Sequence, residues 1–173
     1  MSVIVVGNGP IKNMGSKIDA FDTVIRCHAY ILNYLGSLQQ DVGKKVDIIA
    51  EIEKKYTAEY ILGKYKGNWE IWHFDNKKGN MDGIAYNIAK NAIGKRIKAG
   101  EILPRTGMVA IFEAMRHMEL PVYFTGFTFE NARFNILDPV KKPRWGMHDP
   151  LAEKPVFDKL MYEGKIVKLD EKA

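Results

Sequence analysis

Short apolar runs alternate along the chain with segments in which apolar side chains recur every three or four positions. Residues 3–6 form a β-branched run that ends at Gly7, which is typical of a buried strand. Similar runs predict four further strands, at 21–27, 45–50, 69–74 and 122–125. Helical spacing predicts helices at 56–65 and 81–98, then at 108–115 after Thr106 and Gly107, and finally at 149–161.

The order of these elements predicts the fold class. Strands that alternate with helices favour a mostly parallel sheet covered by helices on both faces. The last helix has the clearest start, because Asp149 can cap a helix and Pro150 suits its first turn. A length of 173 residues is enough for one such domain with its own core. We therefore expect an α/β protein with a single Rossmann-like domain that spans residues 1–173.

Cysteine usage and charge narrow the classes of partner. The single cysteine, Cys27, excludes a disulfide framework. The net charge of +5 favours anionic partners such as nucleotides, phosphates, nucleic acids or membrane surfaces. Nucleic acid is disfavoured, because the basic residues form no stripe interleaved with aromatic residues, and it is kept as the non-enzyme alternative.

The pattern also bears on location. No window reaches the roughly 18 apolar residues of a membrane span, and the first residues lack the basic and apolar regions of a signal peptide. We expect a cytoplasmic protein of bacterial or viral origin, with peripheral attachment to a membrane left open.

A glycine turn with the sequence GNGP follows the first predicted strand. Ligands of parallel sheets bind beyond the carboxyl ends of the strands, where backbone N–H groups of such a turn can approach a phosphate or a sugar. The turn is not a dinucleotide fingerprint, because Lys12 stands where the third glycine is required, and no P-loop signature follows it. A tight strand-to-loop turn without a ligand is the alternative.

Two further segments place candidate chemistry at helix starts. Thr106 and Gly107 could bind an anion with a hydroxyl and free N–H groups, and an ordinary cap by Thr106 is the alternative. His148 precedes the cap of the last helix, whose positive end favours the neutral imidazole that a general base requires. Glu153, about one turn further, would act oppositely, and a structural histidine is the alternative.

These three segments, in this order, resemble the sialyl motifs of sialyltransferases. Residues 3–28 (VIVVGNGPIKNMGSKIDAFDTVIRCH) resemble the long motif of the animal-type family, and their GNGP and RCH are also similar to bacterial lipo-oligosaccharide sialyltransferases. Residues 103–127 resemble the short motif. Residues 148–153 resemble the very short motif, a histidine followed five positions later by an acid.

The resemblance implies a GT-A-variant domain that moves a sialic acid, or a similar 2-keto acid sugar, from its CMP-activated donor to a hydroxyl of a glycan acceptor. His148 would be the general base of a single inverting displacement, with Glu153 in support. The CMP-sugar would contact residues of the long and short motifs, namely Gly7, Asn8, Gly9, His28, Thr106, Gly107, Gly126 and Phe127. The sequence has no D-x-D pair, so neither a metal nor another cofactor is expected beside the donor substrate.

The chain departs from the family pattern at several positions. His28 stands where both families usually have asparagine, and Thr106 stands where serine is usual. A tyrosine-rich third motif is missing before His148, where this chain is basic instead. We hypothesise that Arg144, together with Arg133 and Arg105, replaces tyrosine hydroxyls in neutralising the leaving phosphate.

Other readings of the same motifs stay open. The motifs bear mainly on the CMP half of the donor, so CMP-Kdo, another activated 2-keto acid sugar, fits them as well. An inactive transferase and a different nucleotide-binding α/β domain, for example a pyrophosphokinase-like one, are the remaining alternatives. The acceptor, the linkage and the oligomeric state do not follow from the sequence.

Overall fold

Six strands form one sheet in the order β4-β3-β2-β1-β7-β8, and every neighbouring pair is parallel. The computed structural model describes residues 1–52, 57–74, 82–94, 96–97, 100–101, 103–130 and 148–170. The strands are β1 (Val3–Val6), β2 (Thr23–Cys27), β3 (Ile48–Glu51), β4 (Glu70–His73), β7 (Val122–Thr125) and β8 (Ile166–Lys168). The predicted α/β class with a parallel sheet is confirmed.

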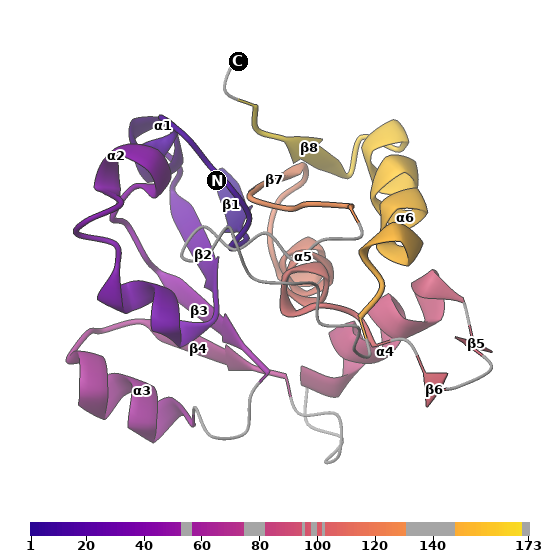
Figure 1. The fold of residues 1–173 in the computed structure, drawn as a ribbon, viewed down its shortest axis with the longest axis horizontal. Coiled ribbons are helices and arrows are strands. Elements are labelled where there is room, and N and C mark those ends of the chain that lie inside the picture. Colours follow the sequence, from indigo (N-terminus) through magenta and orange to yellow (C-terminus); the bar gives the residue numbers. More distant parts are fainter. Residues whose placement is uncertain are drawn as a thin grey trace.

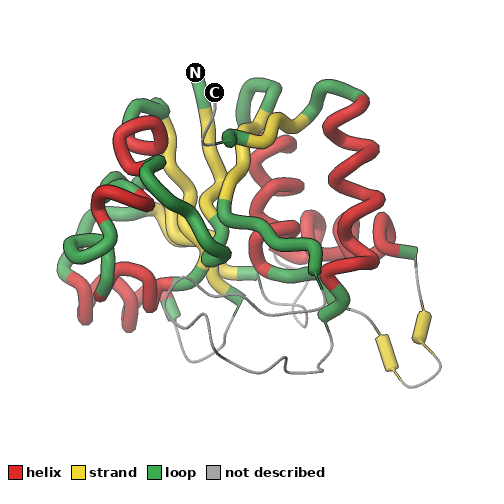
Figure 2. The backbone as a smooth tube through the Cα atoms, turned by 45° about the horizontal axis from the view of Figure 1, so that its top comes forward, coloured by secondary structure: helices red, strands yellow, loops and turns green. Residues whose placement is uncertain are grey.

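Helices cover both faces of the sheet. One side carries α1 (Gly15–Asp19), the 3-10 helix η1 (Ala29–Asn33), α2 (Gln39–Val42) and α3 (Ala58–Tyr65). The other side carries α4 (Asp82–Ile93), α5 (Thr106–His117) and α6 (Pro150–Tyr162). Figures 1 and 2 show the resulting three layers, with the sheet between the two groups of helices. A separate pair of short antiparallel strands, β5 (Arg96–Ile97) and β6 (Gly100–Glu101), follows α4.

The chain order creates a switch point in the middle of the sheet. From β1 the chain builds β2, β3 and β4 outward in one direction and then returns to place β7 on the free side of β1. In open parallel sheets, ligands bind beyond the carboxyl ends of the strands at such a point. The residues that follow β1 and β7 are therefore the expected position of a ligand site.

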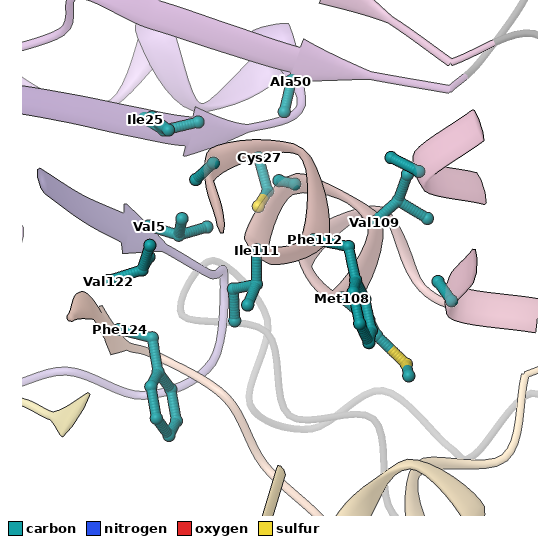
Figure 3. Close-up of a cluster of buried hydrophobic side chains, with 14 of the residues drawn as sticks. Val5, Ile25, Cys27, Ala50, Met108, Val109, Ile111, Phe112, Val122 and Phe124 are labelled. Carbon is teal, nitrogen blue, oxygen red and sulfur yellow. The ribbon is translucent and has the colours of Figure 1, made fainter. Parts of the chain in front are cut away.

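Helix α5 anchors the larger core. Its first nine residues, Thr106 to Ala114, are all buried, which is typical of a helix enclosed on every side. Figure 3 shows Met108 and Ile111 of α5 together with Val5 and Phe124 of the sheet in one apolar cluster. Burial of such a side chain contributes about 1.5–3 kcal/mol, so this cluster holds the start of α5 firmly against the sheet.

Helix α4 differs from the prediction. It ends at Ile93 instead of continuing to 98, because Gly94 takes up a left-handed conformation (φ 63°) that closes the helix. The helical spacing of Ile84, Ile88, Ala92 and Ile93 predicts the apolar face of this helix, but of these four residues only Ile93 is buried. Ile84 and Ile88 are 48% and 38% exposed, whereas the buried positions of the helix are Ala85, Tyr86, Ala89 and Ile93.

Candidate functional site at the carboxyl edge of the sheet

The glycine turn after β1 lies against the end of β7. Gly7 N–H donates to Thr125 O (2.9 Å), and Gly9 N–H donates to Gly126 O (2.8 Å). A Cβ on Gly7 or Gly9 would lie only 2.4 or 2.6 Å from Gly126 O, and Gly126 itself has a φ of +72°. Contact between the two strand ends thus accounts for the glycines without any ligand.

Asn8 is held by the end of β2. Its Nδ2 donates to Cys27 O and to the hydroxyl of Tyr30, both at 2.9 Å. Because a carbonyl can only accept, the orientation of the amide is settled, and both Nδ2 hydrogens are used. Oδ1 is therefore the atom through which Asn8 can accept a hydrogen bond from a ligand.

His28 directly follows β2 and is also held in place by protein contacts. Its Nδ1 lies 2.9 Å from Oε1 of Glu51, a fully buried residue at the end of β3. Its ring stacks on Tyr30, with 5.6 Å between centroids. Neither Glu51 nor Tyr30 was predicted from the sequence as a site residue. The sequence feature that could have identified Glu51 is its position, an acidic residue directly after the predicted strand 45–50.

The start of α5 is closely packed. Thr106 is buried, and a Cβ on Gly107 would lie 2.4 Å from the ring of Phe127. The N-cap of α5 is Arg105, which makes no side-chain cap hydrogen bond, so the alternative of an ordinary cap by Thr106 is wrong. The N–H groups of the first turn of a helix have no partner within the helix, and here this turn lies beside Phe127 and Cys27.

Arg105 joins three segments of the site. Its Nε donates to Glu153 Oε2 (2.6 Å), its backbone N–H donates to Glu153 Oε1 (2.7 Å), and its Nη1 donates to Thr128 O (2.9 Å). Glu153 is fully buried in α6. The pair therefore ties the start of α5 to α6 and to the loop after β7, so most of the guanidinium is engaged by protein.

His148 has a defined tautomer. Its Nδ1 lies 2.8 Å from Leu103 O, and because a carbonyl cannot donate, Nδ1 must carry the proton. In the neutral ring the lone pair is then on Nε2. The next residue, Asp149, accepts from the backbone N–H groups of Leu151 (3.0 Å) and Ala152 (3.2 Å), which confirms the predicted start of the last helix.

Contacts between these segments link the predicted site residues into one connected group. Gly7 and Gly9 contact Gly126, Asn8 contacts the end of β2, Gly107 contacts Phe127, and His148 contacts the segment before α5. Arg133 and Arg144, which we expected to neutralise a phosphate, lie outside the described residues.

Other chemistry is disfavoured near this edge. Burial raises the pKa of the Cys27 thiol to about 12, so it is not a reactive thiolate at neutral pH. Burial also lowers the pKa of Arg26 to about 10. The guanidinium of Arg26 donates to the backbone carbonyls of Lys45 and of Val42 in α2. Within the described ranges no group of His, Cys, Asp and Glu could hold a metal ion, and no helix is long and apolar enough to cross a membrane.

The comparison with known proteins rests on structure alone. No protein-family model matches the sequence, and no curated protein is detectably similar to it. The fold is similar to a mammalian sialyltransferase solved in complex with Gal-beta-1-3GalNAc-ortho-nitrophenol, with a TM-score of 0.57 and 16% identity over 97% of this chain and 68% of that chain. A second structure of a mammalian sialyltransferase gives a TM-score of 0.56 and 17% identity over the same shares. This chain therefore has a sialyltransferase-like fold.

Proposed function

We propose that this protein is a glycosyltransferase that moves a sialic acid, or a similar 2-keto acid sugar, from a CMP-activated donor to a hydroxyl of a glycan acceptor. The proposal is supported by the sialyltransferase-like fold and by the contacts that bring the three sialyl-motif segments together at the carboxyl edge of the sheet.

The observation that carries the proposal is the hydrogen bond between His148 Nδ1 and Leu103 O. It assigns the lone pair of the neutral ring to Nε2, as a general base requires. The bond also orients the ring from the segment that leads into α5, so the base and the start of α5 are held in one unit. The N-terminal position before α6 favours the neutral ring further.

The proposed reaction is a single displacement. The acceptor hydroxyl gives its proton to His148 Nε2 while its oxygen attacks the anomeric carbon of the donor sugar. The bond between that carbon and the phosphate oxygen breaks, and CMP leaves with the electron pair. Attack opposite to the leaving group inverts the anomeric centre.

The donor is assigned to the residues around the switch point. Asn8 Oδ1 can accept from a hydroxyl or amino group of the cytidine. The free N–H groups at the start of α5, with Thr106 and Gly107, suit the phosphate because a helix N-terminus carries a partial positive charge. Gly126 and Phe127 would border the nucleotide. This arrangement needs no metal ion, and we propose a metal-independent transfer.

Calorimetry with CMP, UMP, GMP and NAD in the absence of divalent metal tests the donor site. We expect the protein to prefer CMP and Asn8→Ala to weaken that binding. Turnover of CMP-sialate and CMP-Kdo then identifies the sugar. His148→Asn should retain CMP binding and lose about 10²- to 10⁴-fold in turnover, the usual contribution of a general base.

A matched control is His117→Asn. His117 pairs with Glu113 near the far end of α5, about eleven residues and some 16 Å along the helix from Thr106. This variant should bind and turn over like the wild type. A protein that shows no preference for CMP would refute the proposed function, and an unchanged turnover of His148→Asn would refute the assignment of the base.

A further inference from the structure

The ends of β2 and β3 carry a hydrogen-bonded pair, His28 and Glu51, that the resembling motifs do not imply. His28 occupies the position where asparagine is usual, and its Nδ1 lies 2.9 Å from Glu51 Oε1. The side chain of Glu51 is completely buried, whereas that of His28 is 22% exposed. The pairing therefore buries the acid and leaves part of the imidazole open at the carboxyl edge of the sheet.

Glu51 is anchored by backbone on both sides. Its Oε2 accepts from Ala29 N–H (3.0 Å), and its Oε1 accepts from Ile52 N–H (2.9 Å). A buried carboxyl group surrounded by N–H donors is most stable as the carboxylate. The imidazole must then donate to it, so Nδ1 of His28 carries a proton in either charge state of the ring.

The ring of His28 borders the proposed nucleotide site. It stacks on Tyr30, whose hydroxyl accepts a hydrogen bond from Asn8 Nδ2 (2.9 Å). The backbone of His28 has φ 68° and ψ 129°, and its N–H donates to Ala50 O (2.8 Å). This uncommon conformation for a residue other than glycine directs the ring to Glu51 and Tyr30.

We propose that His28 is an anion-binding residue of the nucleotide site, that Glu51 is its positioning residue, and that His28 Nε2 donates a hydrogen bond to the phosphate of the bound nucleotide. This inference rests on the proposed function. Because Nδ1 is already protonated, a second proton can enter the ring only at Nε2, which changes from an acceptor to a charged donor.

Other charges near His28 set the background for this change. From β3 it faces Glu51, from η1 it faces Tyr30, and His73 of β4 stands opposite Glu51 in the strand register. Arg105 and Arg26 also act on the neighbouring Cys27. The only negative charge among these described groups is Glu51, and it is compensated by its hydrogen bonds, which leaves Nε2 for an external anion.

The test compares CMP with cytidine, which lacks the phosphate, by calorimetry from pH 6 to 8.5. We expect His28→Asn to weaken CMP binding about tenfold at pH 6, as for loss of one charge-assisted hydrogen bond, and to leave cytidine binding unchanged. The difference between wild type and variant should shrink as pH rises, because neutral His28 no longer donates. Ionisation of the phosphate itself is common to both proteins and cancels in this comparison.

Two further measurements keep the inference testable if His28→Asn folds poorly. Glu51→Gln should weaken CMP binding in the same direction and flatten its pH dependence. Binding enthalpies of the wild type in buffers with different ionisation enthalpies should show that the protein takes up protons when CMP binds. His117→Asn removes a second His–Glu pair of the described residues and should match the wild type at every pH.

The outcomes separate the two proposals. If CMP is preferred over UMP and GMP but His28→Asn binds it like the wild type at all pH values, the role of His28 is refuted and the nucleotide site stands. If cytidine loses as much affinity as CMP, His28 contacts the nucleoside and the phosphate assignment is refuted. If the wild type binds no CMP, the proposed function fails together with this inference.

Discussion

Gly7 and Gly9 face the carbonyl oxygen of Gly126 where β1 and β7 end, so backbone already fills the space that a Cβ would need. The sequence shows a glycine turn after a strand, and it predicts a close approach there. It does not show that the approaching group is another strand end, because Gly126 lies far along the chain. A glycine that serves packing and a glycine that admits a ligand have the same sequence signature.

This contact predicts a large difference between two glycine-to-alanine variants. Gly9→Ala places a Cβ 2.6 Å from Gly126 O, and overpacking of this kind costs about 1–3 kcal/mol of unfolding free energy. Gly36→Ala has no atom within 4 Å of the new Cβ, so we expect a change of at most about 0.5 kcal/mol. Urea unfolding of both variants measures this. Equal stabilities would show that the strand ends are not in close contact.

The side chains of the site were only partly predictable. Asn8, His28 and His148 were identified because they belong to recognisable motifs. Glu51 was not, because its role depends on the parallel pairing of Cys27 with Ala50, which brings the ends of β2 and β3 together. Only the strand register reveals that neighbourhood, and a single sequence does not determine it.

At the scale of elements, the start of α5 and the first turn of α6 form one unit through Arg105 and Glu153. Glu153→Gln leaves Arg105 without its buried counter-charge, which should cost about 3 kcal/mol of unfolding free energy. Turnover should fall as well, because His148 sits directly before α6. Both effects can be measured by urea unfolding and steady-state kinetics on the same preparation.

Asp158→Asn is the control for this element. It removes an exposed partner of Lys154 in the same helix, and such surface pairs contribute about 0–1 kcal/mol. If Glu153→Gln were no more destabilising than Asp158→Asn, the link between the two helices would carry little of the stability of the site.

The length of each helix or strand decided whether it could be predicted from the sequence. The bounds of β1 and β7 were predicted as they stand, because a buried parallel strand is a continuous apolar run with glycine after it. Short elements such as α1, α2 and β8 have three to five residues, too few to show a period. The predicted helix at 81–98 was too long because Gly94 ends the helix, and the spacing of apolar residues alone does not show this.

At the scale of the whole molecule, the order of the strands explains why distant motifs meet. Residues 3–28 supply β1 and β2, and residues 103–127 supply α5 and β7, which returns beside β1. Both carboxyl ends therefore lie at the same edge, and the segment that begins at His148 is joined to it through Leu103 and Arg105. The topology therefore brings segments that lie far apart in the sequence to one edge of the sheet.

The net charge of the molecule leads to a prediction about salt and metal. CMP is anionic and the chain carries a net charge of +5, so association should be assisted by long-range attraction that salt screens. We expect the Kd of CMP to rise several-fold between about 50 mM and about 500 mM NaCl, where the Debye length falls below about 5 Å, while the Kd of cytidine barely changes. EDTA should alter neither Kd nor turnover, because the proposed site binds the phosphate with N–H groups and cationic side chains and not with a metal ion. Equal salt dependence for CMP and cytidine would show that the phosphate is not bound by charge, and loss of turnover in EDTA would show that the transfer depends on a metal ion.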